Sequence, residues 1–588
     1  MKKLIALLLA LVMVFGMVAC GAKEAAPEAA PEAAPEAAPE AAPEAAPEAA
    51  PEAEGDKWDD METLVIPLFT DSLDKFAEKG ITMYSQTWLG GIILDKFNID
   101  FELIPDPEDK NAYYMNALAG GDYPAILSYC SNDVLTAYYE AGALVCIDDY
   151  QDQLPEFYAS YGDDVIAQIR AKYPDGKMYS WGGDTPRGDV LANGYTGIVD
   201  IIVQSNLLEE YGLDKLPIGA DEWLDFFVAE QAANPTAPDG TEVYAFTFPG
   251  ADNPIYFYWL AQGRDGKTPV SVDNTQIAAY DYYAGEFIPF ATGDAVKTMF
   301  KWSNDMYKAG VLDPECYTLN QEVMVEKAGN GYVLAIGGNA YSDATINAAL
   351  ETVYGDLSRS VVQMPIATTA DAGRIKAGSG TGQNLALTTS VDPADYERIF
   401  AWLNFMRSEE GLMLYGSGIE GVDYEIVDGV RNPIGKYAEE MANGYAEGYA
   451  FERGMWESYS LATLFGSSWG DWSGDGQPFR LNKLATVATE LGCNDVQKAL
   501  YDKIGWDTYV DWWTENTNRV DVSIPSTISG KNGTEISDQM TELSELMIRY
   551  ASKLTFADDF EAVWAQFVQE MEAAGIQDVV DYCNAQLG

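Results

Sequence analysis

Short apolar runs alternate with stretches of helical spacing along most of the chain. Apolar runs at residues 63–69, 99–104 and 125–127 predict buried strands. A stretch with apolar residues at helical spacing ends at Gly120-Gly121, between the second and third runs. Strands that alternate with helices predict an α/β fold with mostly parallel sheets. Such sheets bind ligands at the carboxyl ends of their strands.

The same alternation continues toward the C-terminus. Residues 198–203 and 333–336 predict strands, and the glycine pair Gly337-Gly338 follows the second of them. Three helices are predicted from residues, nearly all apolar, at three- and four-residue spacing. They are Trp223, Phe226 and Phe227, with Glu230 on the same spacing, in one; Tyr396, Ile399, Phe400, Leu403 and Met406 in the next, after Asp392-Pro393; Phe560, Val563, Trp564, Phe567 and Met571 in the last. Trp564 is therefore expected in the core and not in a binding site.

The N-terminal residues have the pattern of a secretory signal. Lys2 and Lys3 precede an apolar run at residues 4–18, which is short for a permanent membrane span. The following Ala19-Cys20-Gly21 resembles the bacterial lipobox, in which the cysteine becomes the lipidated first residue of the mature protein. We predict a signal peptide at 1–19 and lipidation at Cys20. The alternative is ordinary signal-peptide cleavage beside an incidental cysteine.

Residues 20–56 are predicted to form a disordered tether. Seven Ala-Ala-Pro-Glu units fill residues 25–52. A proline at every fourth position prevents a lasting helix, and Ala, Pro and Glu offer nothing to bury. At about 3 Å per residue, such a spacer reaches roughly 100 Å.

Composition excludes several classes of function. The chain has 35 Lys and Arg against 93 Asp and Glu, a net charge of −58, which argues against binding nucleic acid or anionic membranes. It has no histidine, which excludes Ser-His and Cys-His catalysis and imidazole metal ligation. The cysteines after Cys20 are five in number and lack zinc spacing, so free thiols are expected at Cys130, Cys146, Cys316, Cys493 and Cys583.

Five motifs, in order, resemble one protein family. They are MNALAGGDYPAIL at 115–127, AGALVCIDDY at 141–150, DGKMY at 175–179, MYKAGVLDPE at 306–315 and GIEGVDYEIVDG at 418–429. Together they resemble the extracellular solute-binding proteins of family 1, the receptors of carbohydrate ABC importers. The last motif resembles the long Gram-positive lipoprotein branch of that family. The resemblance fades between residues 438 and 552.

The resemblance implies a two-lobed, periplasmic-binding-protein-like fold of type II, with hinge crossings and a ligand cleft between the lobes. We assign residues 57–185 and 366–437 to the first lobe. Residues 186–365 and 438–588 are assigned to the second. Members of the family often carry a calcium loop after the helix near Asp221, but residues 234–240 contain a single carboxylate, so no metal or other cofactor is predicted.

A sugar receptor needs flat aromatic rings for the apolar faces of a pyranose and planar polar side chains for its hydroxyls. Tryptophans outside the amphipathic helices are the candidates for stacking: Trp88, Trp181, Trp259, Trp469 and Trp472. Polar candidates are Asp471 between two of these indoles, Asp122, Ser128 and Asn132 in the first lobe, and Asn339 in the second. For each, the alternative is a residue that packs within its own lobe.

The predicted function is capture of a neutral oligosaccharide by a monomeric receptor, which presents it to ABC permease subunits without breaking a bond. We expect the protein on the extracellular face of the cell membrane of a Gram-positive bacterium, held by its lipid alone. A receptor for peptides or another small solute is a second possibility. An anchored glycoside hydrolase is a third, because paired carboxylates are plentiful in so acidic a chain.

Overall fold

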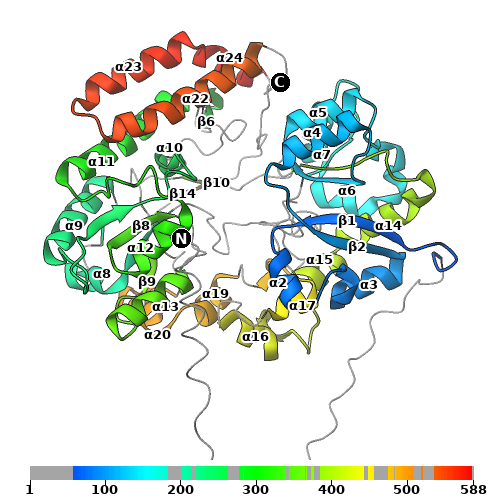
Figure 1. The fold of residues 1–588 in the computed structure, drawn as a ribbon, viewed down its shortest axis with the longest axis horizontal. Helices are drawn as coiled ribbons and strands as arrows, with labels where there is room; N and C mark the ends of the chain where they lie inside the picture. The colour runs from blue at the N-terminus through cyan, green and yellow to red at the C-terminus, as the bar shows by residue number, and fades with distance from the viewer. Residues whose placement is uncertain are drawn as a thin grey trace, which may run out of the picture. The chain divides into compact units, whose positions relative to one another are not determined.

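The computed structural model describes residues 57–182, 200–213, 216–217, 219–261, 277–281, 284–338, 343–364, 366, 373–375, 384–442, 448–455, 475–481, 484–507, 511, 518–520 and 535–585. Contacts divide the chain into Met1–Glu52 and Ala53–Gly588. The second unit contains two groups of elements with separate apolar cores, which we call the first and second lobes (Figure 1).

The first lobe is built on two pairs of strands. β1 (Leu64–Thr70) pairs in parallel with β2 (Ile99–Pro105), and β3 (Ile126–Cys130) pairs antiparallel with β11 (Asn384–Leu387). Successive residues of β3 point to opposite faces, so that Ile126 packs into one apolar cluster and Leu127 into another. The strands predicted at 63–69, 99–104 and 125–127 are thereby confirmed, with ends shifted by at most three residues.

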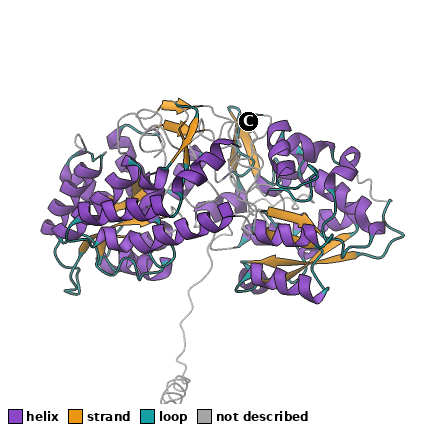
Figure 2. Cartoon of the chain, turned by 90° about the horizontal axis from the view of Figure 1, so that it is seen from above, coloured by secondary structure: helices purple, strands orange, loops and turns teal. Residues whose placement is uncertain are grey.

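Helices cover both faces of these strands (Figure 2). Two of them show how the sequence sets their ends. The side chain of Asp109 accepts a hydrogen bond from the Ala112 N–H at the start of α4, and Gly121, with φ of 73°, ends that helix. The helices and turns of this lobe are α2 (Leu73–Glu78), η1 (Tyr84–Gln86), α3 (Trp88–Phe97), α4 (Lys110–Gly120), α5 (Asn132–Glu140), η2 (Ile147–Gln153), α6 (Pro155–Tyr161), α7 (Asp163–Ala171), η6 (Pro393–Asp395), α14 (Tyr396–Met406), α15 (Glu409–Gly416), α16 (Gly435–Ala442), α17 (Tyr449–Arg453) and α19 (Ala485–Gly492). A hairpin, β12 (Tyr424–Val427) with β13 (Val430–Pro433), completes it.

The second lobe has a four-stranded sheet in the order β5-β8-β4-β9. β5 (Tyr244–Thr247) is parallel to β8 (Val333–Gly338), whereas β4 (Asp200–Gln204) is antiparallel to both β8 and β9 (Val361–Met364). Ile202 faces a small cluster under α12 (Gln321–Gly329) and α13 (Asp343–Tyr354), and its neighbours Ile201 and Val203 face the large core.

The large core is covered by α8 (Ser205–Tyr211), α9 (Ala220–Ala233), α10 (Tyr256–Ala261), η4 (Phe290–Thr292), α11 (Asp294–Ala309), α20 (Asp495–Ile504), α22 (Glu535–Thr555), α23 (Phe560–Ala573) and α24 (Ile576–Ala585). A short hairpin of β6 (Ala279–Asp281) and β7 (Glu286–Ile288) lies against α24. α11 and α22 lie side by side although they are far apart in sequence (Figure 1), and Asn304 of α11 donates to the carbonyls of Thr555 and Ala557 at 3.0 and 2.8 Å. Trp564 is buried in this core, as predicted.

The described residues place three passages of the chain between the two cores. The first leads from Trp181 to β4, and the second from Ile366 to β11. The third lies between α19, whose Val487 packs in the first lobe, and α20, whose Leu500 packs in the second.

This packing differs from the predicted assignment of all of 438–588 to the second lobe. Residues 441, 450, 451, 455, 481, 484 and 487 are part of the first core, because α16, α17 and α19 bury their apolar faces there. Ile366, in turn, packs in the second core. We propose that the first lobe comprises residues up to 182 and 384–492, and the second lobe residues 200–366 and from 495 on.

The prediction of mostly parallel sheets is wrong for the second lobe, and in the first lobe it holds for β1 with β2 but not for β3 with β11. β4 and β11 each enter their sheet directly after a passage from the other lobe. They therefore need no crossover helix within their own sheet, and antiparallel pairing is open to them. β10 (Gly373–Ile375) pairs in parallel with β14 (Asn518–Val520).

The five cysteines after Cys20 are free thiols, as predicted. None of the helices within the described ranges combines the length and the apolar character that a bilayer span requires.

Candidate functional site

The passages between the lobes meet the sheets at a particular edge. In the first lobe, β11 begins at Asn384 opposite Cys130, the last residue of β3, and Trp181 runs antiparallel beside Leu385. In the second lobe, β4 begins at Asp200 opposite Gly338, the last residue of β8. The first two passages therefore start and end where β3 and β8 end. These carboxyl ends are where ligands bind in sheets of this kind.

Tyr129 is the most unusual residue of the first-lobe edge. The pairing of β3 with β11 skips it, since Asn384 is opposite Cys130 and Leu385 is opposite Ser128. Tyr129 is thus the extra residue of a β-bulge, and its φ of 55° lies in the left-handed region that non-glycine residues avoid. Its side chain is 44% exposed, although its neighbours in the strand are buried. Bulges of this kind redirect a side chain and are common beside binding sites.

A polar cluster surrounds the same strand end. The amide of Asn384 donates to the carbonyl of Cys130 at 3.0 Å and to Oδ1 of Asn132 at 3.2 Å. Its own Oδ1 accepts from Nζ of Lys172 at 2.8 Å. Asn132 begins α5, whose N-cap is the hydroxyl of Ser131. Asn384 is 7% exposed and its amide is fully used in these bonds, so it positions the side chains of Asn132 and Lys172 at the strand end that carries Tyr129.

Further aromatic residues extend this edge. The rings of Phe69 and Tyr113 are in edge contact at 5.3 Å, and Tyr113 is 41% exposed. Lys110 lies 5.8 Å from the ring of Phe69 and 5.9 Å from that of Tyr129. Burial raises the pKa of the Cys130 thiol to about 12, so this cysteine is not a nucleophile near neutral pH. The edge can recognise a ligand, but the described residues supply no reactive group to it.

The second-lobe edge is formed by main chain and α10. A Cβ atom on Gly337 would lie 2.2 Å from Oη of Tyr256 and 2.8 Å from Cζ of Phe246, so only glycine lets α10 approach the end of β8 this closely. Trp259, on the same helix, is 38% exposed. The sequence analysis placed Trp259 outside the amphipathic helices; it lies within the short helix α10 and is its exposed residue.

The structure brings together only some of the predicted site residues. Asn132 and Ser128 adjoin Tyr129, but Ser128 is 2% exposed and its main chain is bonded to the Tyr114 hydroxyl at 3.0 Å. Asp122 precedes β3 and so lies at the opposite end of that strand from Asn132. Because β3 separates Asp122 from Asn132, the two do not form one site.

Two of the tryptophans are engaged within the first lobe. Trp181 is 1% exposed and packs edge-on against Phe157, so its indole has no open face for stacking. The prediction that Trp181 stacks on a ligand does not fit this burial. The guanidinium of Arg453 lies over the ring of Trp88, 3.7 Å from its centroid, and Arg453 forms an ion pair with Asp423 at 2.5 Å. One face of the Trp88 indole is therefore covered. Asn339, Trp469, Asp471 and Trp472 lie outside the described residues, as does Cys20.

Tyr129, Lys172 and Asn384 were missed from the sequence. Tyr129 lies between Ser128 and Asn132, which were both predicted as site residues. Side chains alternate between the two faces of a strand, so a regular strand would place Tyr129 on the face opposite to that of Ser128. Asn384 and Lys172 reach the site through pairing with segments more than 200 residues away. The tyrosine within a short strand after Pro124 was the available signal, but nothing in a single sequence marks a bulge.

The loop at residues 234–240 is closed by hydrogen bonds. Asp239 accepts from the Thr241 N–H at 2.9 Å and from the Tyr332 hydroxyl at 2.8 Å. Its carboxylate is therefore already used by the protein. Among the described residues, no group of three or more Cys, Asp or Glu side chains could hold a metal ion.

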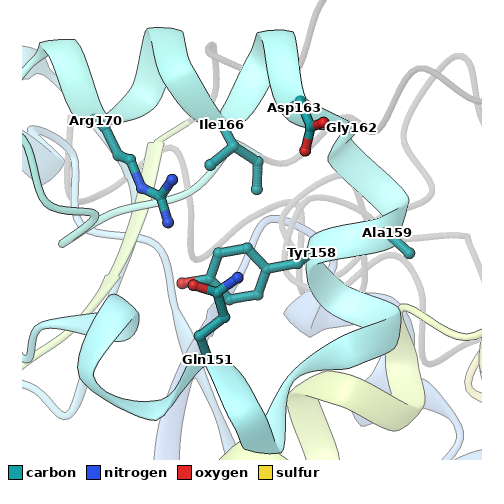
Figure 3. A pocket seen from close by; sticks show the side chains of 7 residues that line it. All are labelled: Gln151, Tyr158, Ala159, Gly162, Asp163, Ile166 and Arg170. Carbon is teal, nitrogen blue, oxygen red and sulfur yellow. The ribbon is translucent and has the colours of Figure 1, made fainter.

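A cavity of about 300 Å³ lies between α6 and α7 of the first lobe (Figure 3). Tyr158, Gln151 and Arg170 point into it. Arg170 donates to both carboxylate oxygens of Asp148, at 2.9 and 2.7 Å, and Tyr158 donates to the same group at 2.7 Å. Arg170, the cationic group of the lining, is thus paired with Asp148 within the lobe, and none of the predicted site residues lines the cavity.

Comparison with known proteins gives structural relatives only. Neither a protein-family model nor a curated protein sequence matches the chain. An HMO-binding, ABC-transporter-associated solute-binding protein from Bifidobacterium longum infantis matches with a TM-score of 0.56 at 14% identity, over 89% of this chain and 98% of the other. The alginate-binding protein AlgQ2 matches with a TM-score of 0.53 at 14% identity, over 91% and 99%. FusA, an ABC-transporter substrate-binding protein of Streptococcus pneumoniae solved with kestose, matches with a TM-score of 0.53 at 13% identity, over 89% and 98%.

At these identities the matches establish a shared fold. The α/β, periplasmic-binding-protein-like fold predicted from the motifs is confirmed, and the matches extend over nearly the whole of the relatives' chains.

Proposed function

We propose, on the premise that this chain has the fold of ABC-transporter solute-binding proteins, that it captures a neutral oligosaccharide and delivers it to the permease of an ABC importer. The relatives named above are described as binding HMO, alginate and kestose. Saccharide capture is therefore the function that both the fold and the chemistry of the first-lobe edge favour.

The observation that carries the proposal is the bulged Tyr129 beside Asn132, Asn384 and Lys172. An exposed ring offers its face to the C–H groups of a pyranose, and amide and ammonium groups read the hydroxyls. The backbone of Tyr129 has a φ of 55°, which a residue other than glycine adopts at a steric cost. Strain of this kind is typical of positions kept for function.

The passages between the lobes give the site a means of closing. Since two of them begin or end at the strand ends that carry the site, a ligand bound there affects the segments that would act as hinges. A ligand that contacts both lobes favours the closed state by its difference in affinity for the two states. In this proposal the second lobe contributes Trp259 and Asn339, and Trp469, Asp471 and Trp472 add further contacts.

The proposal includes the membrane anchor. Cys20 would carry the lipid, and residues 20–56 would let a monomeric receptor move on the outer face of a Gram-positive cell membrane. Mass spectrometry of the protein from its own membrane should show a diacylated N-terminal cysteine. Replacement Cys20→Ser should release the protein into the medium, and a Cys20→Ser protein that stays on the membrane would contradict the anchor.

The test of ligand class is calorimetry with the purified protein against neutral oligosaccharides, uronic-acid oligosaccharides and peptides. We expect binding of a neutral oligosaccharide and unchanged ligand after incubation, as judged by chromatography. Binding of peptides alone would instead support a peptide receptor. Degradation of the saccharide would support a glycoside hydrolase, for which the described residues offer no further evidence.

A further inference from the structure

The motif at residues 418–429 forms a hairpin whose tip is open to solvent. Asp428 and Gly429 connect β12 to β13 with φ of 53° and 84°, and two successive positive values are those of a type I′ turn, for which Asp-Gly is a preferred sequence. Val427 pairs with Val430 across this turn, and Ile426 is the next residue along β12. All six residues from 425 to 430, which we call the hairpin tip, are exposed.

The hairpin tip is apolar as well as exposed. Ile426 is 50% exposed, Val427 48% and Val430 36%. Side chains alternate between the two faces of a strand, so Val427 and Val430 share one face and Ile426 lies on the other. Exposed apolar residues need no explanation when they are scattered singly. These three are gathered around one tight turn, and such patches mark contacts with other molecules.

The base of the hairpin is fixed by buried polar contacts. Arg431 is 1% exposed and donates to Asp475 at 3.1 Å and to the hydroxyl of Ser417 at 2.7 Å. The side chain of Gln477 accepts from the Arg431 N–H at 2.9 Å and donates to the carbonyl of Gly429 at 2.8 Å. Because the strand next to the tip is already held, little conformational entropy is lost when a partner binds the tip.

The charges around the hairpin tip narrow the kind of partner. Residues 420–430 contain no lysine or arginine; Glu420, Glu425 and Asp428 are acidic, as is the buried Asp423. The next lysine along the chain is Lys436, on α16. These carboxylates disfavour a second copy of a chain with a net charge of −58, and they disfavour an anionic bilayer. The complementary partner is a protein groove with apolar walls and a rim of lysine or arginine.

We infer that the hairpin tip docks the protein onto its ABC permease, by entering an apolar groove with a basic rim on the extracellular side of the permease. The inference rests on the proposed function, which supplies the permease as the membrane partner. The hairpin is held by residues 417, 475 and 477, whereas Tyr129 lies at the end of β3. Docking and saccharide binding should therefore be separable by mutation.

Photocrosslinking in the membrane of the bacterium that makes the protein tests the contact. p-Benzoylphenylalanine is incorporated into the full lipoprotein at position 427 or, as the matched control, at position 65. Val65, on β1 of the same lobe, is also 48% exposed. We expect crosslinks from position 427 to a permease subunit identified by mass spectrometry, with a yield at least about fivefold above that from position 65. Crosslinks only to a second copy or to lipid, or equal yields from the two positions, would overturn the inference.

Val427→Ser combined with Val430→Ser tests the role of the tip in delivery. In cells that lack the wild-type copy, uptake of the oligosaccharide that binds in calorimetry should fall at least about fivefold. The affinity for that oligosaccharide and the Tm should stay at the wild-type values, because both valines are exposed and neither is part of the Tyr129 edge. Val65→Ser should transport as the wild type does. Wild-type uptake by the double variant would contradict docking through the tip.

Failure of the proposed function gives a different result. A wild-type protein that binds no saccharide in calorimetry would contradict saccharide capture. The crosslink from position 427 to a permease subunit needs no saccharide, so it decides the docking surface in that case too. It also decides the question if the double variant unfolds.

Discussion

The two lobes end their sheets in different ways. At the end of β3, the first lobe presents side chains: the bulged Tyr129, with Asn132, Asn384 and Lys172 beside it. At the end of β8, the second lobe presents main chain, because Gly337 lies directly under the ring of Tyr256.

The difference suggests that the end of β3 determines ligand affinity and the end of β8 determines how the second lobe packs. At the end of β3, single substitutions of exposed side chains can change which ligand is bound. At the end of β8, Gly337 mainly determines how close α10 and its exposed Trp259 come to the sheet. We expect substitutions at the first edge to change affinity, and substitutions at the second to change stability first.

The largest effect is expected at Gly337. In Gly337→Ala, the new Cβ meets the hydroxyl of Tyr256 at 2.2 Å, so α10 must shift. The loss of stability should be about 1–3 kcal/mol, measured by urea unfolding. Gly120→Ala is the control, because no atom lies within 4 Å of its Cβ and the end of a helix accepts alanine. Equal stability of Gly337→Ala and Gly120→Ala would show that the close approach of α10 to the end of β8 does not depend on glycine.

Asn384→Ala tests the polar cluster of the first edge. It deletes the hydrogen bonds to the Cys130 carbonyl and to Asn132, and it leaves Lys172 without this acceptor. We expect a loss of about 1–2 kcal/mol in unfolding free energy, together with weaker saccharide binding by calorimetry. Unchanged affinity in a folded variant would place the ligand elsewhere.

Three replacements of Tyr129 separate the ring from the strain. Tyr129→Phe should keep affinity, and Tyr129→Ala should lower it by about threefold to tenfold, the value of an aromatic contact. Tyr129→Gly should lower affinity equally yet raise stability by about 0.5–1 kcal/mol, because glycine adopts a positive φ without steric cost. A glycine variant that is less stable than the wild type would show that the bulge is held by packing of the ring.

The smallest effect concerns Asp148 in the first lobe. Burial tends to raise its pKa, but hydrogen bonds from Arg170, Tyr158 and the Met178 N–H outweigh burial, and the pKa is lowered from 3.8. A lowered carboxyl pKa contributes stability above the unfolded-state value, and that stability is lost as pH falls through the folded-state value. Acid unfolding below pH of about 4 should therefore include a contribution from Asp148. Asp148→Asn should show a flatter pH dependence, followed by circular dichroism, and an unchanged slope would contradict this.

Much of the fold could be predicted from patterns that are local in sequence. α9 has Trp223, Phe226 and Phe227 buried at the expected spacing, and α14 follows the Asp392 cap. Both are cases in which one short segment contains the whole signal. The sheet topology was less accessible, because β4 and β11 pair with strands that reach them only through the passages between lobes.

The candidate site was predicted only in part, for a similar reason. Asn132 could be predicted as a residue directly after a strand. Tyr129 could not, since its exposure depends on a register shift against β11, 254 residues further along. Trp181 was predicted to stack on a ligand because it lies outside the predicted amphipathic helices, but β11 and Phe157 cover it. A ring's environment depends on long-range pairing that spacing does not encode.

The first lobe begins near the N-terminus, but β11 and α19, which complete it, are synthesised several hundred residues later. This order affects folding. Until residue 384 has emerged from the ribosome, the edge of β3 that it covers has no strand to pair with, and the first lobe also lacks α14 to α19. Non-local pairing of this kind slows folding and leaves an intermediate that exposes apolar surface. The first lobe should therefore stay incompletely folded through most of the synthesis of the chain, a state compatible with the export that we propose above.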